Sequence, residues 1–384
     1  MAPSLPPAPP PPPSPPPALT DDLLQEIFLR VASPADLARA STACPSFRRL
    51  IADDPAFLRR YRSLHAPLFL GFLKSMPDFG FQPAEAPHPN APAARALARA
   101  ADFSVDHLPP PRWQSWYVCD VLDGLVLYGC EGPLEHDVSP DIAVSDPLSR
   151  RYLLLPPVPG DQFEGSDMLY SEVFFAHPAD EAAFRVIAVM HCQTKSVVFI
   201  FDSGSGGWSV GASISWEALD VGASTMLCCR CYVYGCFYWK FFSTKKLLKL
   251  DMNMEFSIVD LPPDLDGDCI AVVEAGDGRL GLFSHISDDT FLNYYTSVQS
   301  EGHKAGEWQM KNTIPLPVHD DLIILCAPQG YIFLLCKVQD MTETICFSLE
   351  IETLKIEKVC QMRFSGFYSN PYFGFPPSMS PRRL

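Results

Sequence analysis

The sequence predicts a multidomain protein of mixed α and β structure, with a small N-terminal helical domain followed by an all-β, propeller-like domain. Three observations lead to this fold class. Apolar residues within residues 19–65 recur at the spacing of amphipathic helices. Residues 113–375 alternate short apolar strands with turns rich in glycine, aspartate and proline, and this pattern repeats along the chain. With 384 residues, 47% of them hydrophobic, the chain has room for two or three domains.

The helical domain begins with a well-marked first helix. Thr20 is placed to cap its N-terminus, and Asp21 and Asp22 fall in the first turn, where negative charge complements the helix dipole. The apolar residues that follow lie on one face of an amphipathic helix. They are Leu23, Leu24, Ile27, Phe28 and Val31.

Three further helical segments follow the first. Ser33 and Pro34 provide an N-cap and a proline at N1 for the second helix, which must end near Cys44 because Pro45 follows. A third turn and helix comes next, and Asp54–Pro55 starts the fourth segment. The unit contains more apolar side chains than such short helices can bury among themselves, so it implies a partner or a second domain that covers one face.

Three segments flank the two domains. Residues 1–18 are mostly proline, which favours an extended, solvated tail, with docking on a proline-recognition domain as the alternative. Residues 66–112 hold one segment compatible with a buried strand, Pro67–Leu73, then a proline-rich loop and a short helix near Ala93–Ala101. We interpret residues 66–112 as a connector that lies along the next domain. Residues 376–384 form a C-terminal tail.

The all-β domain contains an internal repeat of five units. Each unit has an apolar strand, usually after a glycine turn, then a second apolar strand that ends in an acidic or small polar turn, and then a bulky residue. The bulky residues stand about 48 to 56 residues apart, which suits propeller blades of four strands. They are Tyr152, Trp208, Phe256, Trp308 and Ile356.

A single blade cannot bury both of its faces, so we expect the units to close into a ring. The sequence leaves room for a sixth unit that is either degenerate or completed from the two ends of the domain. Residues 368–375 (YSNPYFGF) either close the ring or lie at a binding face, and the sequence does not decide between these. A large β-sandwich is the structural alternative.

The composition argues against several classes of function. A net charge of −16 and a pI near 4.9 disfavour nucleic acid or an anionic membrane as the main partner. No apolar run approaches the length that spans a bilayer, and the first residues lack the basic and apolar regions of a signal peptide. The 13 cysteines are spread through apolar runs, which favours buried free thiols in a reducing compartment. We therefore expect a cytoplasmic or nuclear protein.

The motifs give no catalytic constellation and no cofactor or metal site. Residues 276–281 match G-x-G-x-x-G, but a strand follows instead of a helix, which favours a hairpin turn over a dinucleotide site. The four cysteines from Cys228 to Cys236 lie along a predicted strand, so alternate thiols point to opposite faces and core packing is favoured over zinc. His191 and Cys192 are adjacent on a strand and cannot easily share a proton. We therefore expect a protein that is not an enzyme.

The helical segment carries a family resemblance. Residues 19–65 resemble an F-box through a run of short motifs. These are Leu19-Thr20, Leu23 to Ile27, Leu37 to Ala40, Ala43 to Phe47, Leu50-Ile51 and Pro55 to Phe57. Thr20 stands where the family usually has proline, and Phe47 stands where it usually has tryptophan. The five-unit repeat is similar to the F-box-associated domains of plant F-box proteins, which are related in pattern to kelch repeats, although no full kelch double-glycine signature is present.

The resemblance implies a substrate-receptor subunit of an SCF-type ubiquitin ligase. The F-box would dock on a Skp-family adaptor, which bridges to a cullin, and the propeller would recruit an unknown client protein. No cofactor, nucleic acid or membrane would be involved. The residues carried over by position to the adaptor contact are Leu19, Thr20, Leu24, Ile27, Phe28, Leu37, Cys44 and Phe47.

Three other readings stay open at this point. The first is an adaptor-independent interaction module with a degenerate F-box, suggested by the departures at Thr20 and Phe47. The second is a kelch-type glycan-binding or enzymatic propeller. The third is a helix-turn-helix DNA-binding domain, which the near balance of seven arginines against six acidic residues in residues 19–65 disfavours.

Overall fold

The computed structural model divides the chain into two compact units, one up to Ala66 and one from Pro67 onward. The predicted tails at 1–18 and 376–384 lie outside the described residues. The structure describes residues 19–374 apart from 33, 66–67, 76–79, 113–114, 131–139, 161–167, 177–183, 222–225, 243, 266–268, 287–288, 299–306, 318–321, 329, 338–342 and 364–368.

The first unit consists of four short helices. They are α1 (Asp21–Phe28), α2 (Pro34–Ala43), α3 (Pro45–Ile51) and α4 (Pro55–Leu64). Thr20 caps α1 as predicted, because its Oγ1 accepts a hydrogen bond from the Leu23 N–H at 3.4 Å. Asp54 caps α4 in the same way and accepts from the Ala56 N–H at 2.9 Å. The capping residues Thr20 and Asp54, both recognised in the sequence, therefore fix where α1 and α4 begin.

A small core joins the four helices. Phe28, Leu37 and Phe57 are buried, with exposed fractions of 6%, 0% and 1%. Tyr61 is also buried and donates a hydrogen bond from its hydroxyl to the Val31 carbonyl at 2.8 Å, which holds the end of α1 against α4. Across the described residues of both units, no helix has the length and hydropathy needed to cross a bilayer.

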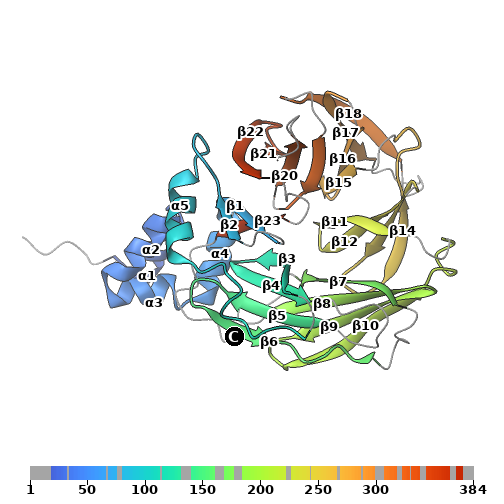
Figure 1. Cartoon of the computed structure of the whole chain (residues 1–384). Coiled ribbons are helices and arrows are strands. Elements are labelled where there is room, and N and C mark those ends of the chain that lie inside the picture. The colour runs from blue at the N-terminus through green and yellow to red at the C-terminus, as the bar shows by residue number, and fades with distance from the viewer. Residues whose placement is uncertain are drawn as a thin grey trace, which may run out of the picture. The chain divides into compact units, whose positions relative to one another are not determined.

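The second unit is a six-bladed β-propeller, counted over the described residues (Figure 1). Five sheets have four antiparallel strands in chain order, and each contains one of the five sequence repeats. The first strands of neighbouring sheets contact one another around the centre of the ring. The predicted repeat is therefore confirmed. The β-sandwich alternative is excluded, because the described strands form six small sheets around a centre and not two large sheets packed face to face.

The strands of the five sheets run from the innermost to the outermost within each sheet. They are β3 (Tyr117–Leu122), β4 (Leu125–Cys130), β5 (Asp141–Asp146) and β6 (Arg151–Leu154); β7 (Met168–Ala176), β8 (Arg185–Cys192), β9 (Lys195–Asp202) and β10 (Gly207–Ser215); β11 (Leu227–Val233), β12 (Cys236–Phe241), β13 (Lys246–Leu250) and β14 (Phe256–Asp260); β15 (Cys269–Glu274), β16 (Leu280–His285), β17 (Phe291–Ser297) and β18 (Trp308–Pro315); β19 (Leu322–Cys326), β20 (Tyr331–Lys337), β21 (Glu343–Glu350) and β22 (Ile356–Arg363).

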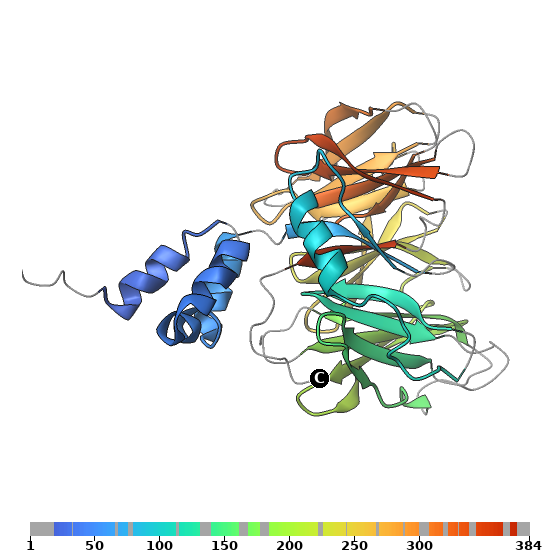
Figure 2. The same cartoon turned by 60° about the vertical axis from the view of Figure 1, so that its left-hand side comes forward.

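The sixth sheet is assembled from both ends of the unit. It contains β2 (Gly80–Pro83), β1 (Leu68–Lys74) and β23 (Ser369–Gly374), in that order. Residues 68–74 and 80–83, which we placed in a connector, thus supply two strands of a blade, and the aromatic stretch at the C-terminal end closes the ring. Gly71 is required in β1, because a Cβ there would lie 2.2 Å from the Gln82 carbonyl oxygen. Helix α5 (Ala91–Ala100) packs against β1 and β2 (Figure 2).

The repeated residues have repeated structural roles. Asp146, Asp202 and Asp251 end or follow the third strand of their sheets, and each accepts a backbone N–H two residues later at 2.8–2.9 Å. Trp208 and Trp308 begin the fourth strands and donate from Nε1 to carbonyls that follow or end the fourth strand of the preceding sheet, at 2.7 and 2.8 Å. The turn at residues 276–281 connects β15 to β16, so the predicted hairpin is confirmed.

Ring closure gives a first testable prediction. Tyr372 in β23 is 2% exposed, packs on Phe81 and Phe103, and donates its hydroxyl to the Gly124 carbonyl at 3.2 Å. Replacing it with alanine opens a cavity at the seam, so Tyr372→Ala should lower the free energy of unfolding by about 3–5 kcal/mol. Urea unfolding followed by tryptophan fluorescence measures this loss. Tyr152→Ala, at a 41% exposed position on β6, is the control and should change the free energy of unfolding little. Equal losses in the two variants would show that the closure of the ring at β23 does not depend on Tyr372.

Candidate functional site

The eight residues predicted to contact an adaptor differ in exposure. Leu19 and Ile27 are 55% and 48% exposed, and Thr20 is exposed as well. Leu24, Cys44 and Phe47 are half-buried. Phe28 and Leu37 lie in the core of the helical unit, where they support the surface and offer little area to a partner.

An apolar stripe runs along α1. It consists of Leu19, Leu23 and Ile27, which are four residues apart and 48–55% exposed, and we call it the α1 stripe. Leu23 and Ile27 are at i and i+4 and so lie on the same face of α1, and Leu19 directly precedes Thr20, the N-cap of this helix. Leu23 was missing from the predicted contact set, although its i, i+4 spacing with the other two would have found it. Full burial of an exposed Leu or Ile side chain is worth about 1.5–3 kcal/mol, and these side chains are about half exposed, so a partner that covers them gains about half of that amount for each.

Phe47 occupies the position of the aromatic anchor in the resemblance. Its ring lies edge-on to Phe28, with centroids 4.9 Å apart. The Phe47 side chain therefore already packs partly within the helical unit. The remaining exposed part is on α3, which contacts α1.

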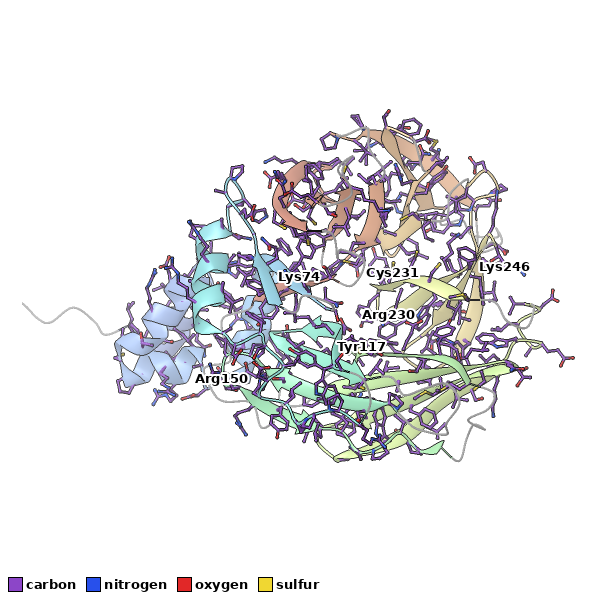
Figure 3. All side chains as sticks on the ribbon, in the orientation of Figure 1. Lys74, Tyr117, Arg150, Arg230, Cys231 and Lys246 are labelled. Carbon is purple, nitrogen blue, oxygen red and sulfur yellow. The ribbon has the colours of Figure 1, made fainter. Side chains whose placement is uncertain are left out.

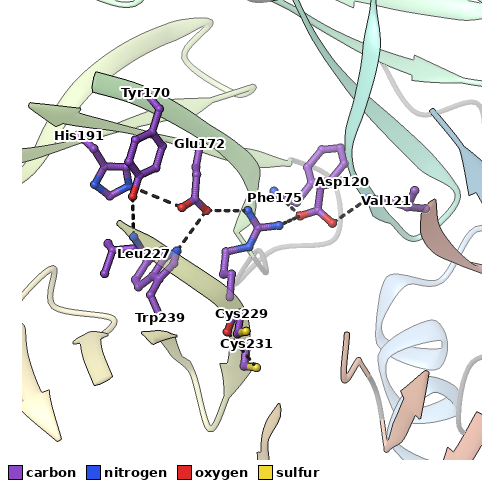
Figure 4. Close-up of polar contacts among 11 residues, drawn as sticks. Asp120, Val121, Tyr170, Glu172, Phe175, His191, Leu227, Cys229, Cys231 and Trp239 are labelled. Atoms are coloured by element: carbon purple, nitrogen blue, oxygen red, sulfur yellow. Dashed lines mark hydrogen bonds and ion pairs between the residues drawn. The ribbon is translucent and has the colours of Figure 1, made fainter. Parts of the chain in front are cut away.

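In the propeller, three charged side chains from three different blades meet near the centre of the ring (Figure 4). Arg230 on β11 lies between Asp120 on β3 and Glu172 on β7, at 3.7 Å and 3.5 Å. Its guanidinium also stacks over the Phe174 ring at 4.2 Å from the centroid. About a quarter of each charged side chain is exposed. We call these three residues the axial cluster.

The partners of Glu172 set its protonation. Its Oε2 accepts a hydrogen bond from Trp239 Nε1 at 3.1 Å, and its Oε1 lies 3.6 Å from His191 Nε2, a contact too long for a hydrogen bond. Burial alone would raise the pKa of Glu172, but the neighbouring His191, the charge of Arg230 and the Trp239 N–H together hold the pKa below its usual value. Glu172 is therefore a carboxylate over the whole physiological range.

Bulges position the axial cluster. The ladders of β3, β7, β11 and β19 each shift register, between Val118 and Asp120 in the first and between Cys228 and Cys231 in the third. Cys229 in the β11 bulge has a φ of 55°. An extra residue in one strand re-aims the side chains beside it, and here it turns Arg230 toward the other two blades.

The four cysteines between Cys228 and Cys236 differ in burial. Cys231 is buried and the other three thiols between Cys228 and Cys236 are half-buried. Burial raises the pKa of Cys231 to about 12, so this thiol is a poor nucleophile. Within the part of the chain that the structure describes, no three His, Cys, Asp or Glu side chains are grouped as metal ligands. The His191 Nδ1 lies 3.1 Å from the Ser196 hydroxyl.

The axial cluster is suited to holding blades together. Its ion pairs join the innermost strands of the first three four-stranded sheets, and the Asp120 carboxylate also accepts the Phe175 N–H of the neighbouring sheet at 3.0 Å. Asp120, Glu172 and Arg230 are single charges within short, mostly apolar segments, and this was the available signal in the sequence.

The chain matches no protein-family model and no curated protein sequence. Among solved structures it is similar to YCF48 bound to a D1 peptide (9% identity, 61% of this chain and 64% of that chain, TM-score 0.35) and to streptogramin B lyase (13%, 63% and 66%, 0.33). It is also similar to the periplasmic gluconolactonase PpgL of Pseudomonas aeruginosa (10%, 66% and 70%, 0.37). The chain covers less than two thirds of the first two structures. Similarity this low carries no argument, and the propeller assignment depends on the sheet topology.

The axial cluster predicts a pH-dependent stability. A carboxyl whose pKa is lowered by folding stabilises the native state above its ordinary pKa, near 4.3, and this contribution is lost as the pH falls through the folded pKa. Glu172→Gln should therefore cost about 1–3 kcal/mol of unfolding free energy at pH 7. Its stability should also fall less steeply than that of the wild type below pH 4.

Urea unfolding measured from pH 7 to pH 3 gives both quantities. Glu352→Gln, at an exposed carboxyl in the turn after β21, is the matched control and should follow the wild-type curve. A Glu172→Gln curve parallel to the wild type at every pH would show that the cluster carries no charge-dependent stability.

Proposed function

We propose that this protein is a substrate-receptor subunit of an SCF-type ubiquitin ligase. The α1 stripe is the single observation that carries the proposal, because it leaves three large aliphatic side chains in solvent, one just before the N-cap of α1 and two on one face of the helix. The order of a four-helix unit followed by a propeller supports it as well, since a propeller is consistent with a protein-interaction module. The motif resemblance of residues 19–65 to an F-box points to a Skp-family adaptor as the partner, and through it to a cullin.

The protein itself makes and breaks no bonds in this proposal. The helical unit binds the adaptor, the propeller holds a client protein, and the ligase gains from proximity between a client lysine and the charged conjugating enzyme. Client contacts fall in loops at one end of the propeller, because a rigid scaffold positions its connecting loops for binding. The partners are proteins of the cytoplasm or nucleus.

An adaptor-independent interaction module is the second candidate. It is favoured by the burial of Phe28 and Leu37, two of the eight predicted contact residues, in the core of the helical unit. The departures at Thr20 and Phe47 from the usual F-box residues point the same way. In this case the α1 stripe is covered by a protein other than the adaptor.

The adaptor interaction can be tested at an exposed position. Ile27→Asp places a charge in the α1 stripe without disturbing the core, because Ile27 is 48% exposed. Burying an unpaired carboxylate at an interface is costly, so binding to a purified Skp-type adaptor should weaken at least roughly tenfold. Isothermal titration calorimetry with the full chain measures the affinity.

Leu64→Asp is the matched control for this experiment. Leu64 is 63% exposed on α4, outside the stripe, and its variant should bind the adaptor as the wild type does. Wild-type protein that fails to bind the adaptor would reject the ligase proposal and favour the adaptor-independent module. Equal loss of binding in both variants would reject the stripe as the contact.

A further inference from the structure

A surface pocket lies at one end of the blade formed by β11–β14. Its volume is about 450 Å³, within the range that takes one or two side chains of a ligand. Three segments build it: the chain before β11, the connection from β12 to β13, and the end of β14 with the residues after it. The lining residues are Asp220, Val221, Thr244, Lys245, Lys246, Asp260, Leu261 and Pro263. Lys246 lies toward the outer side of the ring, far from Arg230 (Figure 3).

Two large apolar side chains are exposed at the same end of this blade. Met226 is 64% exposed and Phe242 is 53% exposed. They are held together because the Phe242 N–H donates to the Met226 carbonyl at 2.8 Å. Phe242 is the first residue after β12, and the same connection to β13 contributes Thr244, Lys245 and Lys246 to the pocket. The apolar pair and the pocket therefore share one loop.

The four charged side chains that line the pocket differ in how far they are buried. Asp220, Lys245 and Asp260 are exposed, where solvent and salt screen their charges, whereas Lys246 is half-buried. The Lys245 ammonium is already bonded to the Pro263 carbonyl. Within the described residues, the Lys246 ammonium has neither a hydrogen bond nor an ion pair, even though Asp260 is its cross-strand neighbour. The least screened charge in the pocket is therefore positive.

We propose that this end of the blade is the client-binding site, and that it takes a peptide segment with a large apolar side chain next to an aspartate or glutamate. The apolar residue packs on Met226 and Phe242, and the carboxylate enters the pocket and pairs with Lys246. The inference rests on the proposed role of the propeller as a client receptor and adds the chemistry of the client. We expect one carboxylate in the client segment and not a run of them, because the net charge of −16 on this chain repels a highly acidic partner.

Selection from a random peptide library displayed on phage tests this proposal, with the immobilised full chain as bait. Wild-type protein should enrich peptides in which an aromatic or large aliphatic residue neighbours an internal aspartate or glutamate. Lys246→Glu should exchange that acidic residue for lysine or arginine in the enriched set. Phe242→Ser should lose the apolar preference. For a synthetic peptide from the wild-type selection, Lys246→Glu should weaken binding by roughly tenfold or more.

Two variants of the same blade serve as matched controls. Lys249→Glu changes a half-buried lysine of β13 outside the pocket, and Met252→Ser changes a 54% exposed methionine in the turn at the opposite end of the blade. Both should enrich the wild-type motif. The proposal is overturned if wild-type protein enriches nothing, if it enriches basic peptides, or if the controls change the motif as strongly as Lys246→Glu. The adaptor is absent from this selection, so its outcome is separate from that of the adaptor titration.

Discussion

The pairing of β1 with β23 is the constraint on which the propeller depends. Residues 68–74 and 369–374 form one antiparallel ladder between segments about 300 residues apart in the sequence. Until that ladder forms, the blades at the two ends of the row each lack a neighbour on one face, because each sheet buries its faces against the adjacent sheets. The aromatic side chains at the seam, among them Phe69, Phe333 and Phe373, supply the apolar area that holds it.

In the closed ring, the centre and the ends of the blades have different roles. At the centre, the axial cluster links the innermost strands of three blades, and Glu172 stays ionised. The ends of the blades carry the exposed apolar side chains and the pocket around Lys246. In the proposed receptor, the linked centre acts as the scaffold and the loops at the ends of the blades bind the client, which is the usual division in recognition domains.

Much of the architecture could be predicted from the sequence because its signals are local. Thr20 and Asp54 mark helix starts by capping, and the bulky residues such as Trp208 and Trp308 mark fourth strands at a nearly constant period. The role of residues 68–83 could not be predicted in the same way, since a strand that pairs with the far end of the chain leaves no local sign of its partner. Even so, the possibility of a sixth unit completed from both ends was visible in the count of repeats.

The sites were less predictable than the fold. Bulges aim Arg230 toward Asp120 and Glu172, and a bulge depends on the register of two strands, which the alternation of apolar residues does not report. The pocket around Lys246 is built from three separate segments and has no motif. The α1 stripe is the exception, because the spacing of Leu19, Leu23 and Ile27 is readable directly, and only their exposure needed the structure.

Hydrogen exchange of the full chain, with and without a purified Skp-type adaptor, tests the central claim most directly. The account predicts that amides of α1 and α3 become protected when the adaptor binds, because the α1 stripe is covered, while the exchange of β3 to β22 stays unchanged. Protection confined to the propeller, or no protection anywhere at saturating adaptor, would contradict the assignment of the helical unit as the ligase-binding surface.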